Sequence, residues 1–321
     1  MNQAELTAGT LEADQLRSTP SFRFLRRLLR RPVAVAAIIV IITIYGAGIL
    51  APFIAPFDFD KTDLRNTFAE PSGEHWLGTD RLGRDVLSRL IWSAQTTVII
   101  SVLVVVGGSL ILGVSLGLTS GYLGGAADNA IMRVADALYS VPTFLLILII
   151  NATMGDRVES LFRDLEGLTG IGGLARSAAP NFFLLSIALS IFGWVGMARL
   201  VRSQVLSLRE ANFVLAARAM GGSTPRILFR HLLPQLTNLM VVAITLSLGA
   251  VAFAEISLTF LGLGVGDHAS FGIMISQYAG PTSVRAHPLL IFAPTVIVTL
   301  LMLSFNLLGD ALTDILSPRR R

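Results

Sequence analysis

The sequence predicts an all-α, polytopic membrane protein with six transmembrane helices. Its composition is 53% hydrophobic and only 14% charged, whereas soluble domains carry roughly 25% charged residues. Six stretches of about 18 or more residues contain no Asp, Glu, Lys or Arg, and each is long enough to cross about 30 Å of hydrocarbon as a helix. These expected spans are residues 32–53, 97–118, 137–155, 177–198, 236–254 and 289–309.

The distribution of Lys and Arg predicts that the N- and C-termini are both cytoplasmic. Basic residues near span ends prefer the cytoplasmic side, and this topology places 16 of the 25 Lys and Arg inside. The net charge of +4 is therefore interpreted as a sign of membrane topology. It does not indicate nucleic-acid binding, because the basic residues flank the spans and form no single stripe. The absence of cysteine excludes disulfides and Cys-based metal sites.

The expected organisation has five parts. They are a cytoplasmic tail (1–31), an uncleaved membrane anchor (32–53), an extracytoplasmic segment (54–93), a transmembrane core (94–309) with a cytoplasmic loop (204–235), and a second cytoplasmic tail (310–321). In the first tail, Phe22, Leu25, Leu28 and Leu29 recur at helical spacing opposite several arginines. This pattern is typical of an amphipathic helix that lies on the inner leaflet in contact with membrane lipid.

Three features inside the spans suggest packing or pathway roles. Gly113, Gly117 and Gly121 recur every four residues, which lets a neighbouring helix approach closely. Pro142 removes a backbone donor and is expected to kink the third span, and kinked helices often border a transport pathway. Glu255 follows the uncharged run of the fifth span, where a carboxylate is costly and suggests function. It either lines the pathway, or is a helix-end residue that is hydrogen-bonded to neighbouring backbone or faces the outer water, and both interpretations stay open.

The stretch "FVLAARAMGGSTPRILFRHLLPQ" (213–235) predicts a short helix, a tight turn and a second short helix. In the first helix, Phe213, Val214, Ala217 and Met220 are expected on one face, with Arg218 on the other. Gly221 and Gly222 then provide the left-handed residue that ends such helices.

The second helix is expected to start with Thr224 as N-cap and Pro225 as first helical residue. Ile227, Leu228 and Leu232 would form its apolar face, and Pro234 would end it at the membrane. An apolar face in water indicates docking to a soluble partner. The alternative is a helix pair that lies on the inner leaflet.

This segment resembles the "EAA" loop of permease subunits of binding-protein-dependent ABC importers. That motif reads Glu-Ala-Ala, three residues, Gly, nine residues, then Ile-x-Leu-Pro. Here Leu215, Ala216 and Ala217 take the first places, Gly221 follows at the right spacing, and His231, Leu233 and Pro234 close the motif. Leu215 replaces the Glu and His231 replaces the Ile. The loss of the Glu puts one carboxylate contact with a partner in doubt.

Further segments are similar to the C-type permease subunit of dipeptide, oligopeptide and nickel importers. They are "HWLGTDRLGRDVLSRLIWSA", "RLVRSQVLSLREANFVLAARAMGGS", "FRHLLPQ", "AEISLTFLGLGV" and "FNLLGDALTDILSPR". They are spread from residue 75 to the C-terminus, so the resemblance covers most of the chain. One departure is "GDHASFGIM", where the family has Pro and Trp before the Gly and Phe271 takes the aromatic place.

The resemblance implies an ABC importer permease core in a bacterial or archaeal inner membrane. It implies a second homologous permease subunit, two cytoplasmic ATPase subunits and an extracytoplasmic solute-binding protein as partners. The expected substrate is a peptide, either a dipeptide or an oligopeptide, with nickel or another small solute as the alternative. The residues expected to contact the ATPase are Phe213, Ala216, Ala217, Arg218, Met220, Gly221, Gly222, His231, Leu233 and Pro234.

No catalytic, cofactor-binding or metal site is expected in this chain. It has no GxxxxGK[ST] loop, so ATP would be bound and hydrolysed by the partner subunits. The four histidines are isolated, with none at ligand spacing. The main alternative is an ion-coupled secondary transporter, but such proteins usually carry inverted repeats and several intramembrane charges. A structural subunit without a pathway is a third possibility.

Overall fold

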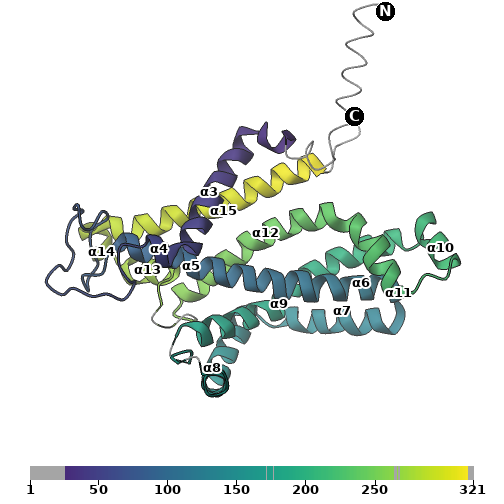
Figure 1. Cartoon of the computed structure of the whole chain (residues 1–321), viewed down its shortest axis with the longest axis horizontal. Coiled ribbons are helices and arrows are strands. Elements are labelled where there is room, and N and C mark those ends of the chain that lie inside the picture. Colours follow the sequence, from purple (N-terminus) through teal and green to yellow (C-terminus); the bar gives the residue numbers. More distant parts are fainter. Residues whose placement is uncertain (1–25, 171, 176, 264–265, 267, 317–321) are drawn as a thin grey trace, which may run out of the picture.

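The computed structural model describes residues 26–170, 172–175, 177–263, 266 and 268–316, and these form an elongated helical bundle (Figure 1). Among the described residues the only β-type pairing is a single bridge between Thr79 and Asp85. Five helical runs are long and apolar enough to cross a membrane. They are Pro32–Ile49, Val86–Leu123, Ala179–Leu208, Thr224–Phe260 and Pro288–Leu316. The all-α prediction is confirmed for this part of the chain.

The helices follow one another in a simple order. They are α3 (Pro32–Ile49), α4 (Ala51–Ile54), α5 (Val86–Val104), the π-helix η1 (Val105–Gly113), α6 (Val114–Leu123), α7 (Gly125–Ser140), α8 (Thr143–Thr169), α9 (Ala179–Leu208), α10 (Asn212–Ala219), α11 (Thr224–Arg226), the π-helix η2 (Ile227–Leu232), α12 (Leu233–Phe260), α13 (Phe271–Tyr278), α14 (Pro281–Ala286) and α15 (Pro288–Leu316). Figure 1 shows α10 and α11 at one end of the bundle, and α13 and α14 at the other.

The third expected span, residues 137–155, is not one straight helix. The chain breaks after Ser140, and α8 leaves at 88° to α7. Val141 is extended (φ −102°, ψ 135°) and Pro142 precedes the first residue of α8. A proline restricts the residue before it to extended backbone and donates no hydrogen bond. The prediction of six spans holds only if this bent pair counts as one span.

The glycines at four-residue spacing lie against α9. A Cβ added to each would meet a close neighbour: Met197 Cβ at 2.7 Å for Gly113, Ala198 O at 2.6 Å for Gly117, and Val205 Cβ at 2.8 Å for Gly121. Because glycine adds no side-chain bulk here, the backbones of the two helices approach closely, as small residues allow in membranes.

The N-terminal end of α3 packs against the C-terminal end of α15. Leu28 is buried and packs with Leu312 in one apolar cluster, and Arg31 Nη1 lies 2.7 Å from Asp314 Oδ2. Leu29 is 55% exposed, so the expectation that Leu28 and Leu29 share one helix face is wrong at this end of the run. The rest of the expected amphipathic helix, including Phe22 and Leu25, lies outside the described residues.

The close approach at Gly117 makes a stability prediction. Gly117→Ile should lower the thermal melting temperature of the detergent-solubilised protein, because its Cβ would overlap the α9 backbone and overpacking typically costs about 1–3 kcal/mol. Gly46→Ile is the matched control, because nothing lies within 4 Å of a Cβ added to Gly46 in α3. Equal melting temperatures for the two variants would contradict the packing argument.

Candidate functional site

The coupling loop (residues 204–235) contains the expected helix–turn–helix. Gly221 is left-handed, with φ 76°, which closes α10 as the sequence predicts. Gly222 has no positive φ. A glycine fits at position 222 for a different reason, because an added Cβ would lie 2.7 Å from Ala217 O. The Gly222 amide donates to that same carbonyl at 2.9 Å.

The second helix differs from the expectation at both ends. Its N-cap is Ser223, with extended backbone and no side-chain cap, one residue before the predicted Thr224. Pro234 does not end it, because the helix continues through η2 into α12 as one run, Thr224–Phe260. The π-helical turns of η2 end at Leu232, two residues before the proline. Such wider turns relieve the i→i−4 pattern that a proline cannot complete, so Pro234 is accommodated within the first turn of α12.

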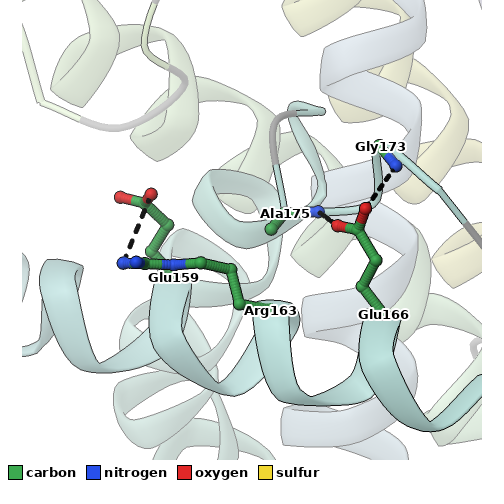
Figure 2. Close-up of a pocket in the computed structure, with 5 residues that line it drawn as sticks. All are labelled: Glu159, Arg163, Glu166, Gly173 and Ala175. Carbon is green, nitrogen blue, oxygen red and sulfur yellow. Dashed lines mark hydrogen bonds and ion pairs between the residues drawn. The ribbon is translucent and has the colours of Figure 1, made fainter.

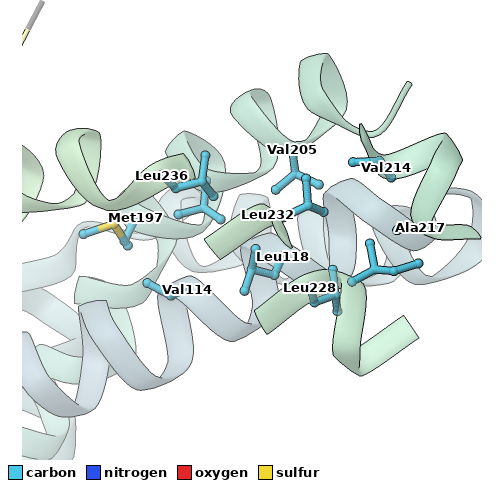
Figure 3. Packing of buried hydrophobic residues seen from close by; sticks show 11 residues of the cluster. Val114, Leu118, Met197, Val205, Val214, Ala217, Leu228, Leu232 and Leu236 are labelled. Atoms are coloured by element: carbon cyan, nitrogen blue, oxygen red, sulfur yellow. The ribbon is translucent and has the colours of Figure 1, made fainter. Parts of the chain in front are cut away.

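Several apolar residues of the loop are buried against α6 and α9 (Figure 3). The buried cluster contains Val114, Leu118, Met197, Val201, Val205, Val214, Ala217, Ile227, Leu228, Leu232 and Leu236. The single apolar face predicted for α10 therefore splits in two. Val214 and Ala217 pack inward, whereas Phe213 is 39% and Met220 81% exposed. The reason is that α10 packs on η2, which covers one side of the helix and leaves the other free.

The residues that remain accessible form the outward face of the loop. Of the expected contact residues, Phe213, Ala216, Arg218, Met220, Gly221 and Pro234 are exposed, Gly222, His231 and Leu233 are half-buried, and Ala217 is buried. Sequence reasoning missed two exposed apolar residues, Leu215 at 47% and Phe229 at 60%. Phe229 could have been found, because it lies off the stripe formed by Ile227, Leu228 and Leu232.

Polar contacts connect the helices at the loop end of the bundle to one another. Arg218 Nε donates to Tyr122 Oη at 3.0 Å, and its guanidinium lies 4.7 Å from the centre of that ring. Arg202 of α9 makes two 2.6 Å bonds to the carboxylate of Asp128 in α7. Two-pronged arginine–carboxylate pairs fix orientation as well as distance. The base of the loop is therefore held in a defined position while its outward face stays free.

A second structured region, the cap (residues 55–85 together with α13), occupies the opposite end of the bundle (Figure 1). Its centre is the buried Asp80, which accepts from Arg84 Nε and from Arg89 Nη1 of α5, each at 2.7 Å. Arg89 also lies 3.4 Å from Gln277 Oε1 of α13. The Tyr278 hydroxyl accepts from the Arg81 amide at 3.3 Å, and burial raises the pKa of Tyr278. These contacts join residues 55–85 of the cap to α5 and to α13.

Three of the four histidines contact phenylalanines of the cap. The pairs are His75 with Phe57, His268 with Phe59 and His287 with Phe68, with ring centres 5.1, 4.2 and 4.1 Å apart. His268 also meets Trp92 and Phe182, and its Nε2 has no hydrogen-bond partner among the described residues. Burial lowers the pKa of His268 to about 4. No group of three metal-ligating side chains occurs in the described ranges.

Glu255 is fully buried near the C-terminal end of α12. Thr97 of α5 donates to its Oε2 at 2.8 Å, while Ser270 Oγ and Thr259 Oγ1 lie 3.2 and 3.4 Å from its Oε1. The carboxyl group is thus enclosed by its own chain and faces no open passage in this structure. The helix-end interpretation is wrong in its details, because the partners of the carboxyl group are side-chain hydroxyls and not backbone groups, and the side chain does not face water. The pathway interpretation stays a prediction.

A surface cavity of about 400 Å³ lies between α8 and the connection to α9 (Figure 2). Glu166 accepts from the amides of Gly173 and Ala175 at 2.7 and 3.1 Å, and Arg163 lies 3.6 Å from Glu159. The charged groups that line this cavity therefore bond to the chain itself. Their arrangement explains how the connection is fixed on α8.

The comparisons with known proteins decide the family. Residues 113–321 match the family model described as the inner membrane component of binding-protein-dependent transport systems, and residues 19–71 match the N-terminal transmembrane domain of oligopeptide transport permease C. The chain belongs to this family. It is a multi-pass permease subunit of a bacterial ABC importer in the inner membrane, and it is not itself an enzyme.

Individual relatives match over nearly the whole chain. The chain is 34% identical to the dipeptide transport system permease protein DppC of Bacillus subtilis, covering 92% of this chain and 85% of the relative. It is 34% identical to the oligopeptide transport system permease protein OppC of the same organism, over 92% and 88%. It is also 34% identical to the glutathione transport system permease protein GsiD of Pectobacterium atrosepticum, over 94% and 92%.

The two regions built above fall in different parts of this permease. The coupling loop and Glu255 lie inside the matched range 113–321, whereas the beginning of the cap lies in the range 19–71. An ABC importer permease works in a complex with other subunits. The outward face of the loop and parts of the cap are exposed at the two ends of the bundle.

The lowered pKa of His268 makes the cap sensitive to acid. Because the folded-state pKa of about 4 lies below the ordinary value of 6.5, the unfolded chain binds the proton more readily. The full contribution to stability is therefore present above pH 6.5 and is lost as the pH falls towards 4, by on the order of 2 kcal/mol. Melting temperature measured from pH 7.5 to 4.5 should fall, and less steeply in His268→Phe. An identical slope in both proteins would contradict this assignment.

Proposed function

We propose that this chain is one of two permease subunits of an ATP-driven importer for peptides. Two ATPase subunits would dock on the coupling loop from the cytoplasm, and an extracytoplasmic solute-binding protein would deliver the peptide at the cap. The pathway would run between this chain and a homologous second permease. One observation carries the proposal. The loop has an exposed apolar face, and the residues beneath that face are buried.

The division of the loop supports docking to a protein. Leu215, Met220 and Phe229 are 47%, 81% and 60% exposed, while the residues beneath them belong to one buried cluster. An exposed apolar face held on a rigid base is typical of a docking surface. Leu215 stands where the "EAA" motif has Glu, so this contact would be apolar in place of charged. Gly221 and Ala216 leave the backbone approachable beside it.

The loop is connected to two helices of the bundle, α12 and α6, through which a movement of the loop could be transmitted. The helix of its second half continues through the π-helical residues of η2 into α12 as one run, so a displacement of the loop would displace that span. Arg218 connects α10 to α6 through Tyr122, which adds a second connection to the bundle. We infer that closure of the ATPase subunits on nucleotide moves the loop and, with it, α12 and α6. The ATP would be bound and hydrolysed by the partner subunits.

The substrate class is inferred from the relatives. Their names specify dipeptides, oligopeptides and glutathione, and all three are peptides. This favours peptides over nickel or another small solute, which the sequence alone left open. The selection of an individual peptide would lie with the external binding protein. Pro142, at the break between α7 and α8, remains a proposed pathway residue.

The first test is the composition of the native complex. The tagged chain, solubilised from its own membranes in mild detergent, should co-purify with a second permease and an ATPase. The purified complex in proteoliposomes should then import a radiolabelled dipeptide only with ATP and the binding protein. Recovery of the chain alone, or uptake driven by an ion gradient without ATP, would instead favour a secondary transporter. Recovery of the complex without uptake of any peptide tested would contradict the peptide assignment.

Coupling itself is tested at Gly221. Gly221→Trp should leave membrane insertion intact but reduce ATP-dependent transport at least tenfold, because the indole would occupy the docking face and a side chain is strained at φ 76°. Gly125→Trp is the matched control. Gly125 also has positive φ (55°), and no atom lies within 4 Å of an added Cβ, yet it begins α7 outside the loop. Normal ATP-dependent transport by Gly221→Trp would contradict the assignment of the loop as the ATPase docking site.

A further inference from the structure

One continuous helical run connects the two functional ends of the chain. It begins at Thr224 in the coupling loop and ends at Phe260 beside the cap. At about 1.5 Å per residue such a helix is long enough to cross the whole membrane. Glu255 lies in the last turns of this run. The groups that bond to Glu255 therefore determine which segments move together with this end of the helix.

Glu255 holds three separate segments together. Its carboxyl group bonds Thr97 on α5 and Thr259 on its own helix, and lies 3.2 Å from the Ser270 hydroxyl. Ser270 is the N-cap of α13, and its Oγ accepts from the Gly272 amide at 3.2 Å. All these polar side chains are at most 1% exposed. A buried carboxyl is costly unless its hydrogen bonds are met, and here α5, α12 and the start of α13 meet them together.

The other end of α13 is fixed to the same helix, α5. Arg89 of α5 lies 3.4 Å from Gln277 near the end of α13 and 2.7 Å from Asp80 in the cap segment. Between these two attachments, the α13 backbone presses on α12. A Cβ added to Gly272 would lie 2.2 Å from Ile256 O. The cap, α5 and the end of α12 are thus bound into one body.

We propose that Glu255 is the positioning residue through which docking of the solute-binding protein on the cap is transmitted along α12 to the coupling loop. The inference rests on the proposed function, in which that protein meets the cap and the ATPase subunits meet the loop. Leu64 and Trp76, at 72% and 70% exposed, present the cap surface outward. Glu255 touches neither partner. It fastens the cap to the helix that ends in the loop.

The test compares basal and stimulated ATP hydrolysis in the complete complex. The importer is reconstituted in proteoliposomes and assayed with and without the binding protein that co-purifies with it, used with the ligand it carries on purification. Glu255→Ala should leave basal hydrolysis within twofold of wild type and reduce its stimulation by the binding protein at least fivefold. Glu255→Gln should retain most of the stimulation, because its amide oxygen still accepts from the hydroxyl groups. A purely structural role would lower basal and stimulated rates together.

Two further variants make the result specific. Ser257→Ala removes a hydroxyl two residues away that donates to Phe253 O of its own helix, and it should behave as wild type. Gly272→Ala leaves Glu255 intact but forces α13 away from α12, and it should lose the stimulation as Glu255→Ala does. Full stimulation in Glu255→Ala would overturn this inference while leaving the proposed function in place. Absence of stimulation in the wild-type complex would overturn the proposed function and this inference with it.

Discussion

The hydrocarbon of a membrane offers no hydrogen-bond partners, and this constraint governs where the polar groups of the chain lie. Every polar group that the lipid would surround must be satisfied by the chain itself. Asp128 is met by Arg202 near the loop end, Asp80 by Arg84 and Arg89 at the cap end, and Glu255 by three hydroxyl groups beside the cap. Between these clusters the helices meet largely through small and apolar residues, as at Gly117 against Ala198, with single hydroxyl contacts such as Tyr45 with Ser101. The polar clusters therefore mark the places where separate segments must keep a fixed relation.

The same constraint explains why the two ends of the bundle look different. At the cap, polar side chains are buried and their bonds cross between segments distant in the sequence, so the region is held from within. At the loop, the buried cluster is entirely apolar, and the exposed face combines Met220 and Phe229 with accessible backbone at Gly221. A surface of this second kind has lost little hydration through folding and can still gain contact with a partner. Both ends expose large apolar side chains, among them Trp76 at the cap and Met220 at the loop, but only the cap is held from within by buried polar groups.

Sequence pattern predicted what depends on one segment at a time. Five of the expected spans, the left-handed turn at Gly221 and the family resemblance follow from composition and spacing, which are local. The failures share one cause, because they depend on what packs against a segment. The sequence pattern places Val214 and Met220 on one face of α10, but only Val214 is buried, because η2 packs on one side of that helix. Pro234 is expected to end a helix, whereas in the structure it lies in the first turn of α12. The partners of Glu255 lie on α5 and before α13, 158 and 15 residues away, and no periodicity relates such distances.

The helices that join the two ends differ in how directly they can transmit a movement. The run α5–α6 is interrupted by nine π-helical residues, Val105–Gly113, and the pair α7 and α8 is broken at Pro142 with a bend of 88°. The α12 helix is regular from Leu233 to Phe260, and Gly249 brings it close to Phe305 of α15, where an added Cβ would lie 2.8 Å from Phe305 Cβ. A regular helix bends less than one with a π-helical or proline break. In the run Thr224–Phe260 the π-helical residues are confined to Ile227–Leu232 at the loop end, so the proposed connection would be carried by α12 itself, from Leu233 in the coupling loop to the carboxyl group of Glu255.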